Sequence, residues 1–504
     1  MNYRFHKDVS SLIETVCRIN QVSIDDLDVS GFPADEDIPV LNEFKKTLLS
    51  YKDKRFFIVG DYDCDGICAT AIISKLFKDL QIASNYYIPS RSREGYGLNK
   101  RIVDTAFEHR FDVLLCVDNG IVANEALSYA RSLGLITLVI DHHEFSEEPE
   151  CDAYLHPVLF DERHADMCAS GLCCLLSQSF RADEVSMVYG GLATLADMVS
   201  VLGYNRYLLK KCIALLNEKP FPAIAYLTGN KKIDYETLSY DVIPKINAVS
   251  RMDDALNVNY VVRYLLSDRK EAAAYLPKIE QINTTRKQLT KEMASLAERL
   301  CDPSKQIIIV SSDAFKEGLC GLIANRLMND LGKPVIILCE SDGLLKGSGR
   351  APKGFDLYSL LKDESHLFSA FGGHAQAVGL SIGIDRYETF LKDMKEKKVV
   401  SQEVFKDVIC RPAESYDTAL IEELDDLKPF GQGFEEPLFC IEDFSYTKKY
   451  MIRGMYPKYT VNEKLEAICF HTAMKDKPFS MAIGSVKKDT YRNDRVSFVI
   501  EDLI

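Results

Sequence analysis

RFFIVGDYDCDG, residues 55–66, decides the fold of the first half of the chain. Its apolar run RFFIVG is a short strand signal, and it ends in three aspartates at alternate positions, Asp61, Asp63 and Asp65. The stretch ATAIISKLFKDL at 69–80 follows with the spacing of an amphipathic helix. A buried strand, a polar turn and a helix form the unit from which parallel sheets are built.

The same pattern recurs twice downstream. Two further apolar runs end in polar residues: VLLCV (113–117) before Asp118, and LITLVI (135–140) before Asp141, His142 and His143. Continuous apolar strands that alternate with helices predict an α/β fold with a parallel sheet covered on both faces. Functional residues of such sheets gather at the carboxyl ends of the strands. We therefore expect these carboxylates and imidazoles to meet at one edge of the sheet.

Carboxylates grouped in this way repel one another unless a cation compensates them. A mixed Asp and His ligand set suits Mn²⁺ better than Ca²⁺, with Mg²⁺ or Zn²⁺ as alternatives. The number of carboxylates favours two divalent cations, which together can activate a water and hold a phosphoryl oxygen. The segment GLATLADMVSVLGYNR at 191–206 adds Asp197 in an apolar helical context.

Each of these signals has a simpler explanation when it stands alone. A DxD sequence is often a loop or a helix cap, and a strand-end Asp often caps the next helix. Adjacent histidines are often surface residues, and Asp197 could be a polar contact between helices. The metal-site interpretation rests on three consecutive β/α units that all deliver ligand-type residues to one edge.

The rest of the chain divides by pattern. The long charged stretch from Asp268 to Leu300 predicts a spacer helix, with a solvated surface helix as the alternative. A new strand–helix–strand pattern begins after Pro303, and after about residue 410 short alternating runs predict a β-rich barrel or sandwich. The predicted domains are an N-terminal helical extension (1–50), a parallel-sheet domain (51–257), connecting helices (258–302), a smaller α/β domain (303–400) and an OB-like β-rich domain (401–504).

Composition narrows the function classes. The chain has 504 residues, which predicts three or four domains, and 61 Lys and Arg against 75 Asp and Glu, a net charge of −14. A net negative charge of this size argues against binding of nucleic acid or anionic membranes over the whole surface, but it permits a local basic channel. We find neither a secretory signal nor an apolar stretch that could span a membrane. The 15 cysteines are interpreted as buried reduced thiols, so we expect a cytoplasmic protein.

The motif series DYDCDG, VDNGI, DHH and ADMVSVLGYNR resembles the DHH phosphoesterase superfamily, and within it the RecJ-type single-strand-specific DNA exonucleases. Further segments are similar to that branch: PSRSREGYG (89–97), KINAVSRMDDA (245–255), GSGR (347–350), GFDL (354–357), FGGHA (371–375) and LKPFGQG (427–433). Three positions depart from the pattern. Lys245 stands where Arg is usual, Ser250 replaces a Gly, and Phe434 replaces an Asn.

The resemblance implies a role for each candidate metal-binding or catalytic residue of the first domain. Two Mn²⁺ or Mg²⁺ ions would be bound by Asp61, Asp63, Asp65, Asp118, His142 and Asp197, with Asp118 as the bridging carboxylate. His143 would face the scissile phosphate as a donor or general acid, and Asp141 would orient a histidine. The implied reaction is hydrolysis of a phosphodiester by metal-bound water, with release of 5′-mononucleotides.

The resemblance also implies where the substrate binds. Ser348, Arg350, Gly373 and His374 of the second domain would hold the strand, and Arg91 and Arg251 would grip the terminal 5′ phosphate. The third domain would add a surface for single-stranded DNA. The expected partners are single-stranded DNA, a single-strand-binding protein and a helicase, and we expect a monomer.

Two other functions fit part of the sequence. The same metal site would serve a DHH phosphodiesterase that acts on short oligoribonucleotides or cyclic dinucleotides, although such an enzyme does not need the spacer helix or the third domain. A catalytically silent scaffold for nucleic acid or replication proteins would not need a complete set of ligands. We expect the exonuclease activity, in DNA repair and recombination.

Overall fold

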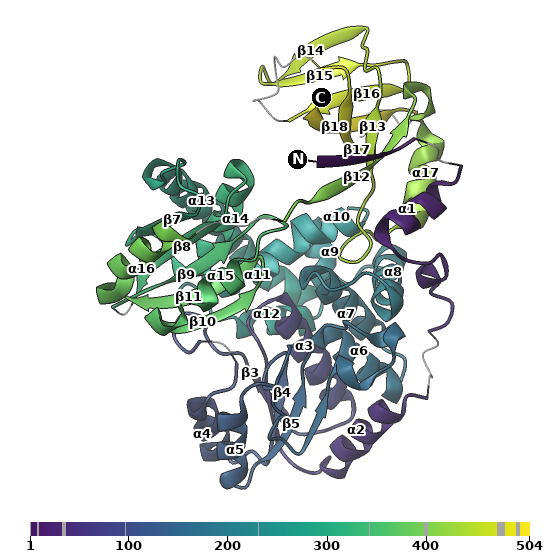
Figure 1. The fold of residues 1–504 in the computed structure, drawn as a ribbon. Coiled ribbons are helices and arrows are strands. Elements are labelled where there is room, and N and C mark those ends of the chain that lie inside the picture. Colours follow the sequence, from purple (N-terminus) through teal and green to yellow (C-terminus); the bar gives the residue numbers. More distant parts are fainter. Residues whose placement is uncertain are drawn as a thin grey trace.

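Three sheets organise the molecule, and each belongs to a different stretch of the chain (Figure 1). The computed structural model describes residues 2–7, 10–32, 37–95, 97–229, 231–341, 343–397, 402–470, 479–489 and 494–504. In Figure 1 the first domain lies below, the second domain beside it in green, and the yellow third domain above.

The first domain contains the predicted parallel sheet. Its strand order is β3-β2-β4-β5-β6, and every neighbouring pair is parallel. The strands are β2 (Phe56–Val59), β3 (Ser84–Tyr87), β4 (Val113–Val117), β5 (Ile136–Ile140) and β6 (Ala153–Leu155). The α/β architecture expected from the sequence is confirmed.

Helices cover both faces of this sheet, because successive strand residues point to opposite sides. Phe56 and Ile58 pack into the core that contains α2 (Pro39–Ser50), α3 (Cys64–Asp79) and α6 (Ala169–Phe180). Phe57 and Val59 pack into a second core, with α4 (Lys100–Glu108) and α5 (Asn124–Ser132). Both faces of the strands are therefore apolar, as the continuous apolar runs predicted.

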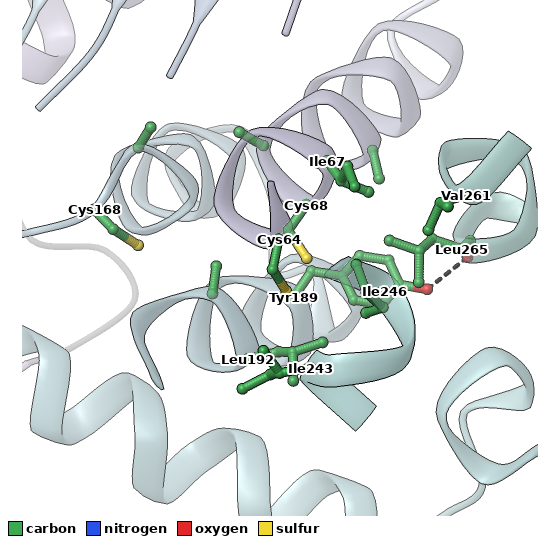
Figure 2. Close-up of a cluster of buried hydrophobic side chains, with 14 of the residues drawn as sticks. Cys64, Ile67, Cys68, Cys168, Tyr189, Leu192, Ile243, Ile246, Val261 and Leu265 are labelled. Atoms are coloured by element: carbon green, nitrogen blue, oxygen red, sulfur yellow. Dashed lines mark hydrogen bonds between the residues drawn. The ribbon is translucent and has the colours of Figure 1, made fainter. Parts of the chain in front are cut away.

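A group of helices follows the sheet in the chain, and several of them pack against α3. They are α7 (Glu184–Ala196), α8 (Gly203–Glu218), α9 (Pro222–Thr228), α10 (Tyr235–Thr237), a π-helical turn (Leu238–Val242), α11 (Ile243–Arg251) and α12 (Asn259–Leu266). Figure 2 shows Cys64 and Cys68 of α3 against Tyr189 of α7. The Tyr189 hydroxyl donates to the Leu265 carbonyl at 2.5 Å, which ties α7 to α12. This packing holds the first turn of α3, where the aspartates lie.

The predicted spacer helix is α13 (Arg269–Leu300), 32 residues long. It begins at Asp268, whose side chain accepts from the backbone N–H of Lys270 and Glu271, while the Glu271 side chain accepts from the Asp268 N–H. This capping box stabilises the start of the helix. The helix continues through Pro277.

The second domain is a smaller α/β unit. Its sheet has the order β10-β11-β9-β8-β7, in which only β7 and β8 are parallel. The strands are β7 (Ile308–Ser312), β8 (Val335–Ser341), β9 (Leu344–Arg350), β10 (Phe368–His374) and β11 (Ala377–Gly383), and the helices are α14 (Glu317–Leu331), α15 (Leu357–Lys362) and α16 (Ile384–Glu396).

The third domain is β-rich, as predicted. Its eight strands run in the order β1-β12-β13-β17-β18-β16-β15-β14. They are β1 (Asn2–His6), β12 (Phe405–Arg411), β13 (Leu438–Ile441), β14 (Lys448–Ile452), β15 (Tyr456–Thr460), β16 (Leu465–Cys469), β17 (Ala482–Lys488) and β18 (Val496–Leu503), with helix α17 (Thr418–Leu427). The proposed boundary at 400/401 lies outside the described residues.

The N-terminal segment differs from the predicted helical extension. It contains the helices α1 (Leu12–Asn20) and α2, but it begins with β1, which pairs in parallel with β12. Helix α1 contributes Leu12 and Val16 to the core of the third domain, whereas α2 packs in the first domain. The segment therefore belongs to two domains. Its first strand is hydrogen-bonded to β12, about 400 residues later in the chain, whereas α2 packs on the sheet of the first domain.

Two expectations from composition can be compared with the structure. Among the described residues no disulfide links the 15 cysteines, and 13 of them are buried. Among the residues that the structure describes, no helix combines the length and the apolar character needed to cross a membrane.

Candidate metal centre and phosphate site

Ligand-type side chains converge at the carboxyl ends of three neighbouring strands, β2, β4 and β5. Three groups have possible ligand atoms within 4.8 Å of one another: Asp61 with Asp63 and Asp118, Asp118 with His142 and His143, and Asp65 with His142 and Asp197. The six residues predicted to bind metal are thus brought together. Shared members link the three groups into one cluster.

His142 stands at the centre of this cluster. Its Nε2 atom lies 3.3 Å from Asp118 Oδ1, 3.6 Å from Asp197 Oδ2 and 3.8 Å from Asp65 Oδ2. Asp197 comes from the C-terminal end of α7, outside the sheet. Helix α7 therefore adds a ligand-type side chain to a site that is otherwise built at the ends of the strands.

The local backbone explains how β4 delivers Asp118. Asp118 has φ 62°, in the left-handed region, and Gly120 follows with φ 106°. A Cβ atom at Gly120 would lie 2.8 Å from the Cβ of Cys116, so the turn leaves no room for a side chain. This strained turn directs the chain away from the sheet immediately after the candidate ligand.

Asp65 and Asp63 have structural contacts as well. Both oxygens of Asp65 accept backbone N–H groups at the start of α6, from Ala169 and Ser170, each at 2.8 Å. Asp63 caps α3 and accepts from the N–H of Asp65 and Gly66. The helix-cap interpretation and the ligand interpretation are therefore compatible, because a carboxylate oxygen can accept a hydrogen bond and still bind a cation.

The electrostatics of the cluster favour bound cations. Burial and then the charge of Asp63 raise the pKa of Asp61 well above its ordinary value, and burial and then Asp65 do the same for Asp118. Burial and then Asp65 raise the pKa of Asp197 to about 8. Asp61 Oδ1 is buried and has no hydrogen-bond donor among the residues that the structure describes. Hard oxygen donors with uncompensated charge fit Mn²⁺ or Mg²⁺.

His143, a member of the cluster, also forms a pair with Asp141. Asp141 Oδ1 lies 2.7 Å from His143 Nδ1 and also accepts the backbone N–H of His142 and His143, while Oδ2 accepts the N–H of Ile121. Burial alone would lower the pKa of His143, but the hydrogen bond and the charge of Asp141 raise it to about 9. Asp141 thus fixes the ring orientation of His143 and favours its protonated form.

A group of arginines lies next to the aspartates. Burial, and then the charges of Arg91, Arg286 and Arg350, together lower the pKa of Arg251 to about 10, with Asp63 acting in the opposite direction. The guanidinium of Arg91 also lies over the ring of Tyr62, 5.0 Å from its centroid. Like charges gathered in a buried site favour binding of an anion, so this cluster suits a phosphate group.

Arg286 is the member of this cluster that the sequence analysis missed. It lies on α13, and both its Nε and Nη2 atoms donate to Asn283 Oδ1, at 3.2 and 2.9 Å. Asn283 is itself buried, so it holds the guanidinium in one orientation. The charged pattern of α13 carried no signal for this role, because other exposed charges surround Arg286 in the sequence.

The first and second domains meet at Arg251. Its Nη1 donates to the carbonyl of Gly318 at the start of α14, at 3.2 Å. A Cβ atom at Gly318 would lie 2.3 Å from the Arg251 carbonyl oxygen, so the close approach requires a glycine. Lys316 and Asp254 form an ion pair beside it, at 2.8 Å. Residues 251–254 of the first domain and residues 316–318 of the second domain thus form one interdomain contact.

The predicted substrate residues of the second domain share one end of its sheet. Ala377 of β11 pairs with Arg350 of β9 on one side and with His374 of β10 on the other. Gly373 has φ 136°, and both Gly373 and His374 are exposed. A Cβ atom at Gly321 would lie 3.2 Å from Arg350 Nη2 and 3.5 Å from Ser348 Oγ, so α14 packs closely against these two side chains.

The loop after Asp197 contacts the segment that leads into the third domain. The Val201 N–H donates to the Gln432 carbonyl at 2.9 Å. Arg206 is 1% exposed, and its guanidinium donates to the carbonyls of Leu427, Lys428 and Pro429. The loop that follows the candidate ligand Asp197 therefore contacts the segment that leads into the third domain.

Comparison with known proteins agrees with this geometry. Three family models match in order: the N-terminal domain of the DHH family at residues 55–199, the DHHA1 domain at 304–399, and the RecJ OB domain at 409–502. The single-stranded-DNA-specific exonuclease RecJ of Escherichia coli is 29% identical over 76% of this chain and 74% of that protein. The protein of the same name from Bacillus subtilis is 26% identical over 79% of this chain, which spans only 53% of that relative.

Solved structures support the fold. RecJ from Thermus thermophilus in complex with Mn²⁺ aligns with a TM-score of 0.84 at 20% identity, over all of this chain and 80% of that chain. The same protein in complex with Mg²⁺ aligns with a TM-score of 0.77 at 19% identity, over 78% of that chain. Together the three matched domains account for most of the chain, in the expected order. The chain therefore belongs to the DHH family, in the RecJ-type branch that adds a DHHA1 domain and a RecJ OB domain.

Proposed function

We propose that this protein is a metal-dependent exonuclease that hydrolyses single-stranded DNA from its 5′ end and releases 5′-mononucleotides. One observation carries the proposal: a cluster of Asp and His side chains adjoins a cluster of four arginines. The first cluster fits two cations, and the second fits a terminal phosphate. The activity of the RecJ proteins of E. coli and B. subtilis supports the assignment of DNA as substrate.

In the proposed site, Asp61, Asp63, Asp65, Asp118, His142 and Asp197 would hold two Mn²⁺ or Mg²⁺ ions, and Asp118 would be a ligand of both. When bound, such ions lower the pKa of a water and stabilise charge on phosphoryl oxygens. Asp118 suits the shared position because it belongs to two of the three ligand groups. His142 belongs to two groups as well, which supports its place beside Asp118 and Asp197.

His143 donates a proton or a hydrogen bond to the scissile phosphate in this mechanism. The hydrogen bond between Nδ1 and Asp141 orients the ring so that Nε2 is the atom that faces a substrate. The Asp141 carboxylate favours the protonated form of the ring, because its hydrogen bond and its charge raise the pKa of His143. A positively charged donor next to the metal cluster stabilises charge that develops on a phosphate oxygen.

Arg91, Arg251, Arg286 and Arg350 grip the 5′ phosphate, with Ser348 as a further donor. A terminal phosphate monoester carries more negative charge than an internal diester, so four guanidinium groups favour the end of a strand. Gly373 and His374 lie on the same end of the second sheet, and they extend this surface along the strand.

The proposal also includes protein partners, a cellular location and an oligomeric state. An enzyme that acts on single strands needs a strand-separating activity upstream, so a helicase and a single-strand-binding protein are the proposed partners. The lack of disulfides among the described cysteines supports a reducing compartment, and so a cytoplasmic location. Exposed large apolar side chains are scattered over many elements of the described chain, which supports a monomer.

A second candidate, phosphodiesterase activity on oligoribonucleotides or cyclic dinucleotides, would use the same metal cluster. The test uses purified full-length protein with Mn²⁺ and a single-stranded DNA labelled at either end. The control substrates are a duplex, a ribodinucleotide and a cyclic dinucleotide. We expect metal-dependent release of mononucleotides from the 5′ end, and no cutting of the duplex. Turnover of the dinucleotides alone would contradict the exonuclease proposal.

A further inference from the structure

The turn between α11 and α12 contains a buried carboxylate. Arg251 is the last residue of α11, and Asp253 follows two residues later. Asp253 is 8% exposed, and a carboxylate is rarely buried unless hydrogen bonds or charges compensate it. It belongs neither to the metal cluster nor to the arginine cluster, so its burial needs another explanation.

The hydrogen bonds of Asp253 run to the segment that carries Arg91. Its Oδ2 atom accepts from the Ser90 hydroxyl at 2.7 Å and from the backbone N–H of Ser92 at 2.9 Å. These two residues flank Arg91 on either side. The backbone of Arg91 is therefore held by one oxygen atom of the turn that follows Arg251.

Side-chain hydrogen bonds also define the rest of this segment. Residues 88–95 contain neither helix nor strand. Asn259, the first residue of α12, accepts from the N–H of Ile88 at 2.9 Å and donates to its carbonyl at 3.0 Å. Glu94 accepts from the N–H of Ser90 at 2.9 Å. The course of the segment thus depends on contacts with α12 and with the turn before it.

Arg91 needs such support because a second guanidinium lies nearby. Burial and then the charge of Arg91 lower the pKa of Arg251, so the two positive groups repel each other. The Tyr62 ring supports the far end of Arg91, at 5.0 Å from its guanidinium carbon. Two arginines that are in place before a phosphate arrives bind it more tightly, because less conformational entropy is lost on binding.

We infer that Asp253 is a positioning residue for the 5′ phosphate: through the backbone of residues 90–92 it sets the spacing between Arg91 and Arg251. The inference rests on the proposed function and names the residue on which the preference for a phosphorylated end depends. Asp253 itself does not touch the substrate.

The experiment compares two single-stranded DNA substrates that differ only in a phosphate or a hydroxyl at the 5′ end. With Mn²⁺ and the full-length protein, kcat and KM are measured on both for the wild type, Asp253→Ala, Asp253→Asn and Ser90→Ala. The alanine variant of Asp253 removes both hydrogen bonds. Asparagine keeps one acceptor oxygen, and Ser90→Ala removes only the bond from the hydroxyl.

We expect Asp253→Ala to lower kcat/KM on the 5′-phosphorylated strand by about tenfold, the effect of weakening a hydrogen bond to a charged group. The loss should be mainly in KM, since the terminal phosphate is held but does not react. The 5′-hydroxyl strand should be affected much less. Asp253→Asn should recover most of the preference, and Ser90→Ala should reduce it by about threefold, the effect of one hydrogen bond.

The matched control is Asp152→Ala, which removes a carboxylate with the same kind of contacts. Asp152 Oδ2 accepts from the N–H and the hydroxyl of Thr137, at 2.7 and 3.0 Å. Thr137 lies at the amino end of β5, at the edge of the sheet opposite to the metal cluster. Asp152→Ala should lower Tm but keep the preference for the 5′ phosphate, which separates a loss of stability from a loss of position.

Equal losses on the two strands in Asp253→Ala would overturn the inference, and so would an Asp253→Asn variant that behaves as Asp253→Ala. If Asp253→Ala does not fold, an unchanged preference in Ser90→Ala overturns it. If the wild type prefers the 5′ phosphate and the Asp253 variants keep that preference, only this inference fails. If the wild type does not cut single-stranded DNA at all, the proposed function fails, and the inference with it.

Discussion

The buried aspartates of the metal cluster carry charges that the protein alone does not compensate. Asp61 and Asp118 are 3% and 2% exposed, and burial raises the pKa of both. Natural proteins retain such unfavourable groups at functional sites, where a ligand supplies the missing interaction. The stability of this protein should therefore depend on whether cations are bound.

We predict that Asp118→Asn stabilises the metal-free protein, because a neutral amide replaces a buried charge among like charges. About 1 kcal/mol would raise Tm by roughly 2–4 °C for a domain of this size. In the same variant, Mn²⁺ should lose most of its stabilising effect, which for the wild type reaches about 2.7 kcal/mol at one hundred times Kd. Thermal unfolding with Mn²⁺ and with chelator measures both effects.

The control is Asp53→Asn, which changes an exposed aspartate before the start of β2, whereas the cluster lies beyond the carboxyl end of that strand. It should respond to Mn²⁺ as the wild type does. An unchanged Mn²⁺ response in Asp118→Asn would show that Asp118 does not bind a cation.

Arg251 permits a second prediction at the scale of one residue. Arg251→Gln should lower kcat/KM on 5′-phosphorylated single strands by roughly 10–100-fold, the effect of losing hydrogen bonds to a charged group. Activity on strands with a 5′ hydroxyl should change far less, so the preference between the two ends should collapse. The matched control is Arg269→Gln, an exposed arginine at the start of α13. An equal loss on both substrates would refute a specific contact to the terminal phosphate.

At the scale of secondary-structure elements, one buried side chain of α8, Arg206, holds the segment 427–433 in place. Arg206 donates to the carbonyls of Leu427, Lys428 and Pro429 on that segment, and to Leu27 of the N-terminal region. Its guanidinium also lies over the ring of Phe434, 5.4 Å from the centroid. One cation thus satisfies several backbone acceptors that would otherwise be buried without a donor.

We predict that Arg206→Ala destabilises the protein by at least about 3 kcal/mol, because it leaves buried carbonyls unsatisfied at roughly 1–3 kcal/mol each. Arg206→Lys should rescue little of this loss, since an ammonium group cannot reproduce the planar fork. Arg326→Ala, which removes an exposed pair with Glu298, should cost less than about 1 kcal/mol. Urea unfolding measures these differences, and equal effects at Arg206 and Arg326 would contradict the anchoring role.

At the scale of the whole molecule, the two ends of the chain meet in one sheet (Figure 1). Strand β1 pairs with β12 through all five of its residues, the Tyr3 hydroxyl donates to Asp502, and His6 contacts Asp407 at 2.7 Å. The third domain therefore cannot complete its sheet without the first residues of the chain.

Deletion of residues 1–7 should destabilise the third domain selectively, because it exposes the edge of β12 and removes the contacts to Asp407 and Asp502. In limited proteolysis, we expect faster cleavage after residue 402, with the first domain protected as in the wild type. Mn²⁺ should still stabilise the first domain. Uniform loss of protection across all three domains would argue against a local role for β1.

Much of the site could be predicted from the sequence because strand ends are local signals. A short apolar run that stops at a carboxylate marks the end of a buried strand, and parallel strands place these ends at one edge. The grouping of Asp61, Asp118 and His142 follows from that rule, and the structure brings these residues together. Their roles as ligands remain predictions.

Other features depended on contacts between distant segments. The sequence alone determined the α/β first domain, the order of the three domains and the residue types of the metal cluster, because these follow from local patterns of polarity. Only the tertiary structure decided that Arg286 joins the arginine cluster, that Asp65 anchors α6, and that β1 belongs to the third domain. The physical reason is that such partners are chosen by packing and by unsatisfied hydrogen-bonding groups, and neither leaves a periodic trace in the sequence.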